Sequence, residues 1–85
     1  MRLITEIPNP HFKITVFEWN QKYLIKLEEE GLEQTFKVGV FDVANDQALK
    51  SLIDDDFINS AKARFNDMRK SLEQALMKNQ NSNLT

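Results

Sequence analysis

The segment that decides the fold is FKITVFEWNQKYLIKLE, residues 12–28. Two runs within it, 12–19 and 22–28, are rich in β-branched and aromatic residues and alternate apolar with polar side chains, which is typical of half-buried strands. The pair Asn20-Gln21 between them predicts a two-residue turn, because asparagine tolerates a positive φ. The segment therefore predicts an antiparallel hairpin.

This turn sets the register and sorts the side chains onto two faces of the hairpin. One face receives the pairs Val16–Ile25 and Ile14–Leu27, with Glu18 opposite Tyr23. The other face receives Phe17–Leu24, Thr15–Lys26, Lys13–Glu28 and Trp19–Lys22. Apolar and opposite-charge pairs that arise from one choice of turn support that choice. We expect Glu18, which lies beside the turn, to reach water past the edge of the sheet.

A third strand is predicted over residues 32–38, after a turn near Gly31. A loop of even length places Leu32, Phe36 and Val38 on the face of Ile25, so the hydrophobic pattern selects the register. Gln34 is the polar exception on that face. Residues 3–7 are the candidate for a short edge strand, which Pro8-Asn9-Pro10 would end because proline cannot donate to the ladder.

The hydrophobic period becomes helical after the connector 39–45, whose Val40, Phe41 and Val43 are too apolar to be wholly exposed. Asp46 is expected to cap a short helix that runs to about Ile53 and buries Ala48, Leu49 and Leu52. Asp54-Asp55-Asp56 then precedes a long helix over 57–78. Its apolar stripe has alternating spacings of three and four residues and consists of Ile58, Ala61, Phe65, Met68, Leu72 and Ala75, widened by Phe57 and Leu76.

These elements predict one α+β domain over residues 1–78. It consists of a three- or four-stranded antiparallel β-meander, a short helix, and a long C-terminal helix packed on one sheet face. Residues 79–85 are polar and unpatterned, and we expect a disordered tail there.

The composition speaks against most kinds of reaction chemistry. The chain has no cysteine, one histidine and two glycines, so a thiolate metal site and a glycine-rich phosphate loop are excluded. His11 is expected to begin a strand, and the serines do not form a recognisable nucleophile site. The aspartates at 54–56 favour helix capping over cation binding, because they lack the spacing of a Ca²⁺ loop. We therefore expect no enzyme activity, no cofactor, no metal and no small-molecule ligand.

The N-terminus and the hydropathy bear on localisation. Glu6 falls where a signal peptide needs an apolar core, and no apolar run is long enough to span a membrane. We expect a cytoplasmic protein that does not bind a membrane. The net charge of −2 also argues against nucleic acid as a partner.

The remaining feature is surplus apolar surface. If the long helix covers the Val16 face, then Phe17, Trp19 and Leu24 need another cover: the N-terminal segment, the connector with the short helix, or a second protein. We expect a protein–protein interaction or assembly module of otherwise unknown role, which pairs with itself as a homodimer or with another protein. The interface candidates are Phe17, Trp19, Leu24, Phe65, Met68 and Leu72. The alternative is single-stranded nucleic-acid binding through an aromatic and basic sheet face.

Overall fold

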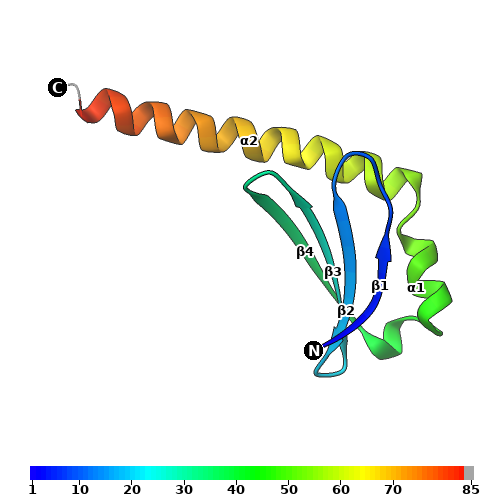
Figure 1. The fold of residues 1–85 in the computed structure, drawn as a ribbon. Coiled ribbons are helices and arrows are strands. Elements are labelled where there is room, and N and C mark those ends of the chain that lie inside the picture. Colours follow the sequence, from blue (N-terminus) through cyan, green and yellow to red (C-terminus); the bar gives the residue numbers. More distant parts are fainter. Residues whose placement is uncertain (84–85) are drawn as a thin grey trace.

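The computed structural model describes the backbone of residues 1–83 and the side chains through Asn79. Four antiparallel strands lie side by side in chain order and are followed by two helices (Figure 1). The strands are β1 (Arg2–Ile7), β2 (Lys13–Trp19), β3 (Lys22–Glu29) and β4 (Leu32–Gly39). A 3₁₀ turn, η1 (Val40–Asp42), leads to the helices α1 (Asp46–Leu52) and α2 (Asp55–Asn83). The α+β prediction is confirmed, with residues 2–7 as the fourth strand.

The predicted register of the β2–β3 hairpin is confirmed. Val16 lies opposite Ile25, Phe17 opposite Leu24, and Lys13 opposite Glu28. Asn20 and Gln21 form the turn with φ values of 55° and 64°, which is the two-residue geometry that matches the twist of the strands.

The second turn also follows the prediction. It consists of two residues, Glu30 and Gly31, and Gly31 has a φ of 71°. Its even length places Phe36 opposite Ile25 and Val38 opposite Tyr23. Strand β4, which is the third strand of the predicted meander, therefore presents its apolar residues on the predicted face.

The core lies on the Val16 face of the sheet, between the strands and both helices. Its fully buried side chains are Ile14, Val16, Ile25, Leu27, Leu49 and Phe65. The ring centroids of Phe12 and Phe65 are 5.4 Å apart, and those of Phe36 and Phe57 are 5.1 Å apart. Because α1 and the first half of α2 both pack on this face, neither of them covers the opposite face of the sheet.

Three details of the helical region differ from the expectation. The cap of α1 is Asn45, whose side chain accepts a hydrogen bond from the Ala48 amide at 2.8 Å, so the assignment of Asp46 as cap was wrong by one residue. Leu52 is exposed, and Ile53 is buried in its place. Phe41 is 91% exposed, although its neighbours Val40 and Val43 pack against the core as expected.

The long helix extends further than the stripe suggested. Asp54 caps it by accepting a hydrogen bond from the Phe57 amide at 2.9 Å, as the acidic cluster predicted. Residues 79–83, expected in the tail, continue α2, since neither proline nor glycine interrupts them. Residues 84 and 85 lie outside the described residues.

Candidate interaction surfaces

The first candidate surface is the outer face, by which we mean the sheet face opposite the core. It carries Lys13, Thr15, Phe17 and Trp19 from β2 and Lys22, Leu24, Lys26 and Glu28 from β3. Leu3, Phe17 and Leu24 are register partners and form an apolar row across three strands. Phe17 is half-buried, Leu24 is 8% exposed, and Trp19 is 55% exposed. The outer face thus has an apolar centre and an exposed tryptophan at one end.

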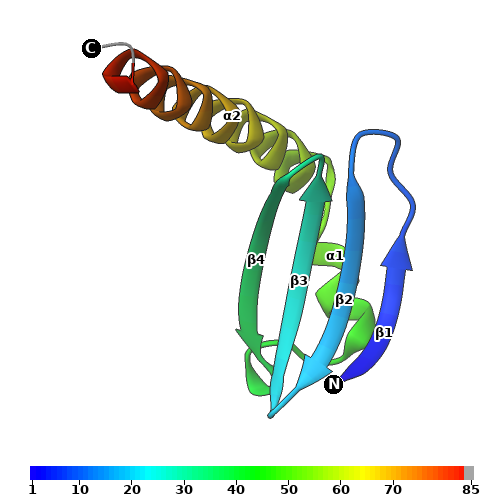
Figure 2. The same cartoon turned by 60° about the vertical axis from the view of Figure 1, so that its left-hand side comes forward.

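Neither internal segment that could have served as a lid covers this face. Within β1, Ile4 and Ile7 pack against the core. Leu3 is the apolar residue of β1 that reaches the outer face, beside Glu6, and it is itself exposed. Figure 2 views the sheet with α1 behind it, and no helix of residues 1–83 crosses in front of the strands. Of the three covers considered from the sequence, the two that belong to this chain are therefore not found on the outer face within residues 1–83.

The second candidate surface is the projecting segment of α2, residues 70–79, in which every side chain is exposed. Leu72 and Leu76 follow Phe65 by seven and eleven residues, close to two and three full turns, so all three lie on one side of the helix. Phe65 is 1% exposed, whereas Leu72 is 49% exposed. The apolar stripe therefore continues after the helix has left the sheet (Figure 1).

The direction of α2 brings the two surfaces into one region. Figure 1 shows α1 on one side of the strands, whereas α2 passes the end of the sheet and finishes on the other side. In Figure 2, with α1 at the back, the C-terminal end of α2 is the nearer part. The projecting segment and the outer face are therefore on the same side of the sheet.

Contacts along β4 and the end of β3 hold the first half of α2 in this direction. The buried Gln34 side chain donates from Nε2 to the Ala61 carbonyl at 2.9 Å and accepts at Oε1 from Arg64 Nε at 2.8 Å. The Arg64 guanidinium lies 5.5 Å from the centroid of the Phe36 ring. Arg69 pairs with Glu29 at 2.7 Å, beside the β3–β4 turn. These contacts fix the angle at which α2 leaves the sheet.

Four of the six interface candidates lie on the two candidate surfaces, and the other two belong to the core. Phe17, Trp19 and Leu24 come together on the outer face, and Leu72 lies on the projecting segment. Phe65 is buried against Phe12, and Met68 is half-buried against the core. We therefore take Phe65 and Met68 as parts of the fold of the single chain.

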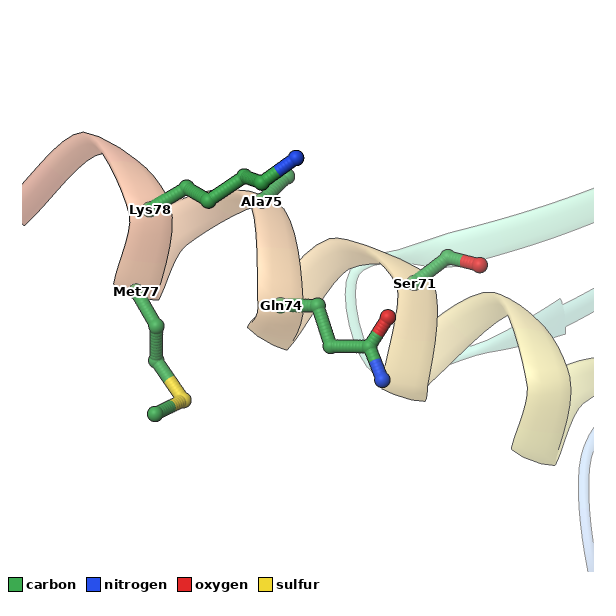
Figure 3. A pocket seen from close by; sticks show the side chains of 5 residues that line it. All are labelled: Ser71, Gln74, Ala75, Met77 and Lys78. Atoms are coloured by element: carbon green, nitrogen blue, oxygen red, sulfur yellow. The ribbon is translucent and has the colours of Figure 1, made fainter.

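A shallow hollow on the projecting segment is lined by Ser71, Gln74, Ala75, Met77 and Lys78 (Figure 3). All five side chains come from one helix, and Met77 and Lys78 point to opposite sides of it. A single helix cannot surround a ligand. We therefore do not take the hollow as a ligand site.

Electrostatics on the outer face centre on Lys26. Its Nζ atom lies 3.0 Å from Glu33 Oε1, 3.9 Å from Glu28 Oε1, and 5.9 Å from the centroid of the Phe17 ring. The hydrogen bond to Glu33, with the charges of both glutamates, raises the pKa of Lys26. Lys26 is therefore a fixed cation that already has partners within its own chain.

The polar residues considered for chemistry have structural surroundings. His11 lies two residues before β2, so the expectation that it begins a strand was wrong, and its Nε2 is 3.5 Å from Lys62 Nζ. Glu18 pairs with Arg2 at the edge of the sheet. Within residues 1–83, no three histidine, aspartate or glutamate side chains are grouped so that they could hold a metal ion.

Sequence reasoning missed three features of these surfaces. Gln34 looked like an imperfection, although a polar residue on a core face signals a buried partner. Phe41 was expected to be partly covered. Met77, which is 61% exposed, lies outside the three-four stripe and was not considered.

Compared with known protein families, curated proteins and solved structures, the chain has no match. None of the described helices has the length and apolar character needed to cross a membrane.

Proposed function

We propose that this protein is an assembly module that binds a second copy of itself through the outer face and the projecting segment of α2. The observation that carries the proposal is the continuation of the apolar stripe into solvent at Leu72 and Leu76, which are 49% and 52% exposed. An amphipathic helix gains stability when its apolar side is buried. Here the single chain buries only the first half of that side.

The overall dimensions support a partner. The radius of gyration is 16.3 Å, whereas a compact chain of this length has about 12 Å. The exposed surface is 6231 Å², whereas a compact monomer of 9.9 kDa exposes about 5,200 Å². The excess of about 1,000 Å² reflects the projection of α2 beyond the sheet, and its apolar part is the surface that a partner could bury.

The small core gives a dimer a physical role. An 85-residue chain buries only about 60–65% of its unfolded surface, and this chain has no disulfide to compensate. Association stabilises the folded state by mass action. The proposal assigns no reaction to the chain.

Sedimentation equilibrium of the wild type, Leu72→Glu and Gln74→Glu tests the proposal. Both variants add one negative charge to the projecting segment, but Gln74 lies outside the apolar stripe. We expect the wild type to self-associate, Leu72→Glu to raise the dissociation constant at least about tenfold, equivalent to about 1.4 kcal/mol, and Gln74→Glu to behave as the wild type. A wild type that keeps a mass of 9.9 kDa at millimolar concentration contradicts self-association.

One observation favours single-stranded nucleic-acid binding as a second candidate function. Phe17 and Trp19 lie on the outer face beside Lys22 and Lys26, and bases stack on aromatic rings in basic grooves. The net charge of −2 and the ion pairs of Lys26 weigh against it. Titration of a labelled oligonucleotide at low salt decides between the two: binding that Trp19→Ala abolishes supports this candidate, and the lack of binding removes it.

A further inference from the structure

We propose that the second copy docks outer face to outer face, about a two-fold axis that runs parallel to the strands between β2 and β3. This inference rests on the proposed self-association and specifies its geometry. In a two-fold interface, residue i of one copy contacts residue j of the other, and j contacts i. The axis proposed here places β2 of each copy over β3 of the other at the same height.

Complementary side chains on these two strands carry the inference. Across the hairpin, Lys13 lies opposite Glu28, Phe17 opposite Leu24, and Trp19 opposite Lys22. A rotation that exchanges β2 with β3 places each of these side chains over its own cross-strand partner in the second copy. For example, Lys13 of one copy lies over Glu28 of the other. The interface then contains two Lys–Glu pairs, two Phe–Leu contacts and two Trp–Lys contacts, which are favourable pairings. It also contains two Thr15–Lys26 contacts, and Leu3 of β1 comes over Lys37 of β4.

The other face-to-face arrangement lacks this match. An axis that runs across the strands inverts the height. Placed at the middle of the strands, it sets Phe17 over Thr15 of the second copy and Leu24 over Lys26. Placed at the height of Phe17 and Leu24, the same axis stacks the apolar row on itself. It then sets Lys22 over Lys26 of the second copy, and like charges that lie directly opposite are destabilising. The distribution of side chains therefore favours the axis parallel to the strands.

The projecting segment of α2 is compatible with this arrangement and extends it. It lies on the side of the sheet toward which the outer face points (Figures 1 and 2). A copy seated on the outer face therefore comes within reach of Leu72 and Leu76. One contact region would then bury both exposed apolar surfaces.

Site-directed cross-linking tests the orientation, because the chain has no cysteine of its own. Lys22→Cys and Glu28→Cys place single thiols at opposite ends of the outer face of β3. Lys50→Cys on α1, on the core side, is the control. Each variant alone, and a mixture of the first two, is treated with a short bis-maleimide and separated on a denaturing gel.

We expect Lys22→Cys and Glu28→Cys each to form covalent dimers on its own, and Lys50→Cys to form none. Cross-linking only in the mixture would place Lys22 of one copy beside Glu28 of the other, and this would overturn the proposed orientation. A dimer by sedimentation that is not cross-linked at either position would overturn docking through the outer face and leave self-association through α2. A monomer by sedimentation would instead contradict the proposed function itself.

Discussion

Gln34 is the residue on which the direction of α2 depends most directly. Its side chain is buried between β4 and α2 and makes two hydrogen bonds to the helix, to the Ala61 carbonyl and from Arg64. A buried amide without such partners would cost on the order of 1–3 kcal/mol. The polar exception in the core face is therefore a specific joint between the sheet and α2.

Replacement of Gln34 by alanine is expected to lower the free energy of unfolding by about 2–3 kcal/mol, because it removes both hydrogen bonds and leaves a cavity. Thr35→Ala, at the neighbouring exposed position, is the control and should cost less than about 1 kcal/mol. Urea denaturation measures both. Equal losses in the two variants would show that Gln34 does not act as a joint.

Tyr23 and Asp46 form a second polar contact, between β3 and the first turn of α1. The Tyr23 hydroxyl donates to Asp46 Oδ1 at 2.8 Å. This hydrogen bond, followed by burial, raises the pKa of Tyr23 above its ordinary value of 10.0. The contact therefore stabilises the fold fully below pH 10 and is lost as the pH rises through the raised pKa.

Because Tyr23 is the single tyrosine, the absorbance of tyrosinate follows this residue alone. We expect its titration midpoint to lie above 10 in the folded wild type and to fall toward 10 in Asp46→Ala, with folding monitored by circular dichroism. Identical midpoints in the two folded proteins would contradict the assigned cause of the shift.

At the scale of elements, α2 is one helix with two different roles. The first half buries Ala61 and Phe65 against the sheet, whereas the projecting segment exposes Leu72 and Leu76. Apolar periodicity reveals which side of a helix is apolar, but not how far the sheet beneath it extends. The apolar stripe is therefore continuous in the sequence, although only its first half packs against the sheet.

The two halves are expected to respond differently to truncation of an apolar side chain. Phe65→Ala should lower the free energy of unfolding by about 3–5 kcal/mol. In dilute solution, where the chain is monomeric, Leu72→Ala should change it by less than about 0.5 kcal/mol. Denaturation at low concentration measures both, with Phe65→Leu as a milder variant that stays folded. A large loss in Leu72→Ala would mean that the projecting segment packs within its own chain.

The β-meander could be derived almost completely from the sequence. The hairpin of β2 and β3 followed from one turn and its complementary pairs, and Gly31 set the third strand in the same register. These features are local, since a turn and alternating side chains define them together. The burial of Phe65, the exposure of Phe41 and the direction of α2 depend on how distant segments meet, which periodicity does not encode.

At the scale of the whole molecule, the chain is extended, with principal dimensions of 56 × 27 × 18 Å. The long dimension comes from α2, and the outer face lies on the side to which α2 projects (Figures 1 and 2). A second copy placed there would bury the apolar row, Trp19 and the leucines of the projecting segment together. The central claim is thus that another copy of the chain covers the outer face.

Trp19 reports on this claim directly, because it is the single tryptophan and lies on the outer face. The measurement is acrylamide quenching of its fluorescence over a range of protein concentrations, with Leu72→Glu as the control whose self-association is weakened. We expect quenching to weaken and the emission to shift to shorter wavelength as the wild-type concentration rises, and the same changes in Leu72→Glu to need at least about tenfold higher concentration. A Trp19 that is quenched equally at every concentration would contradict the account.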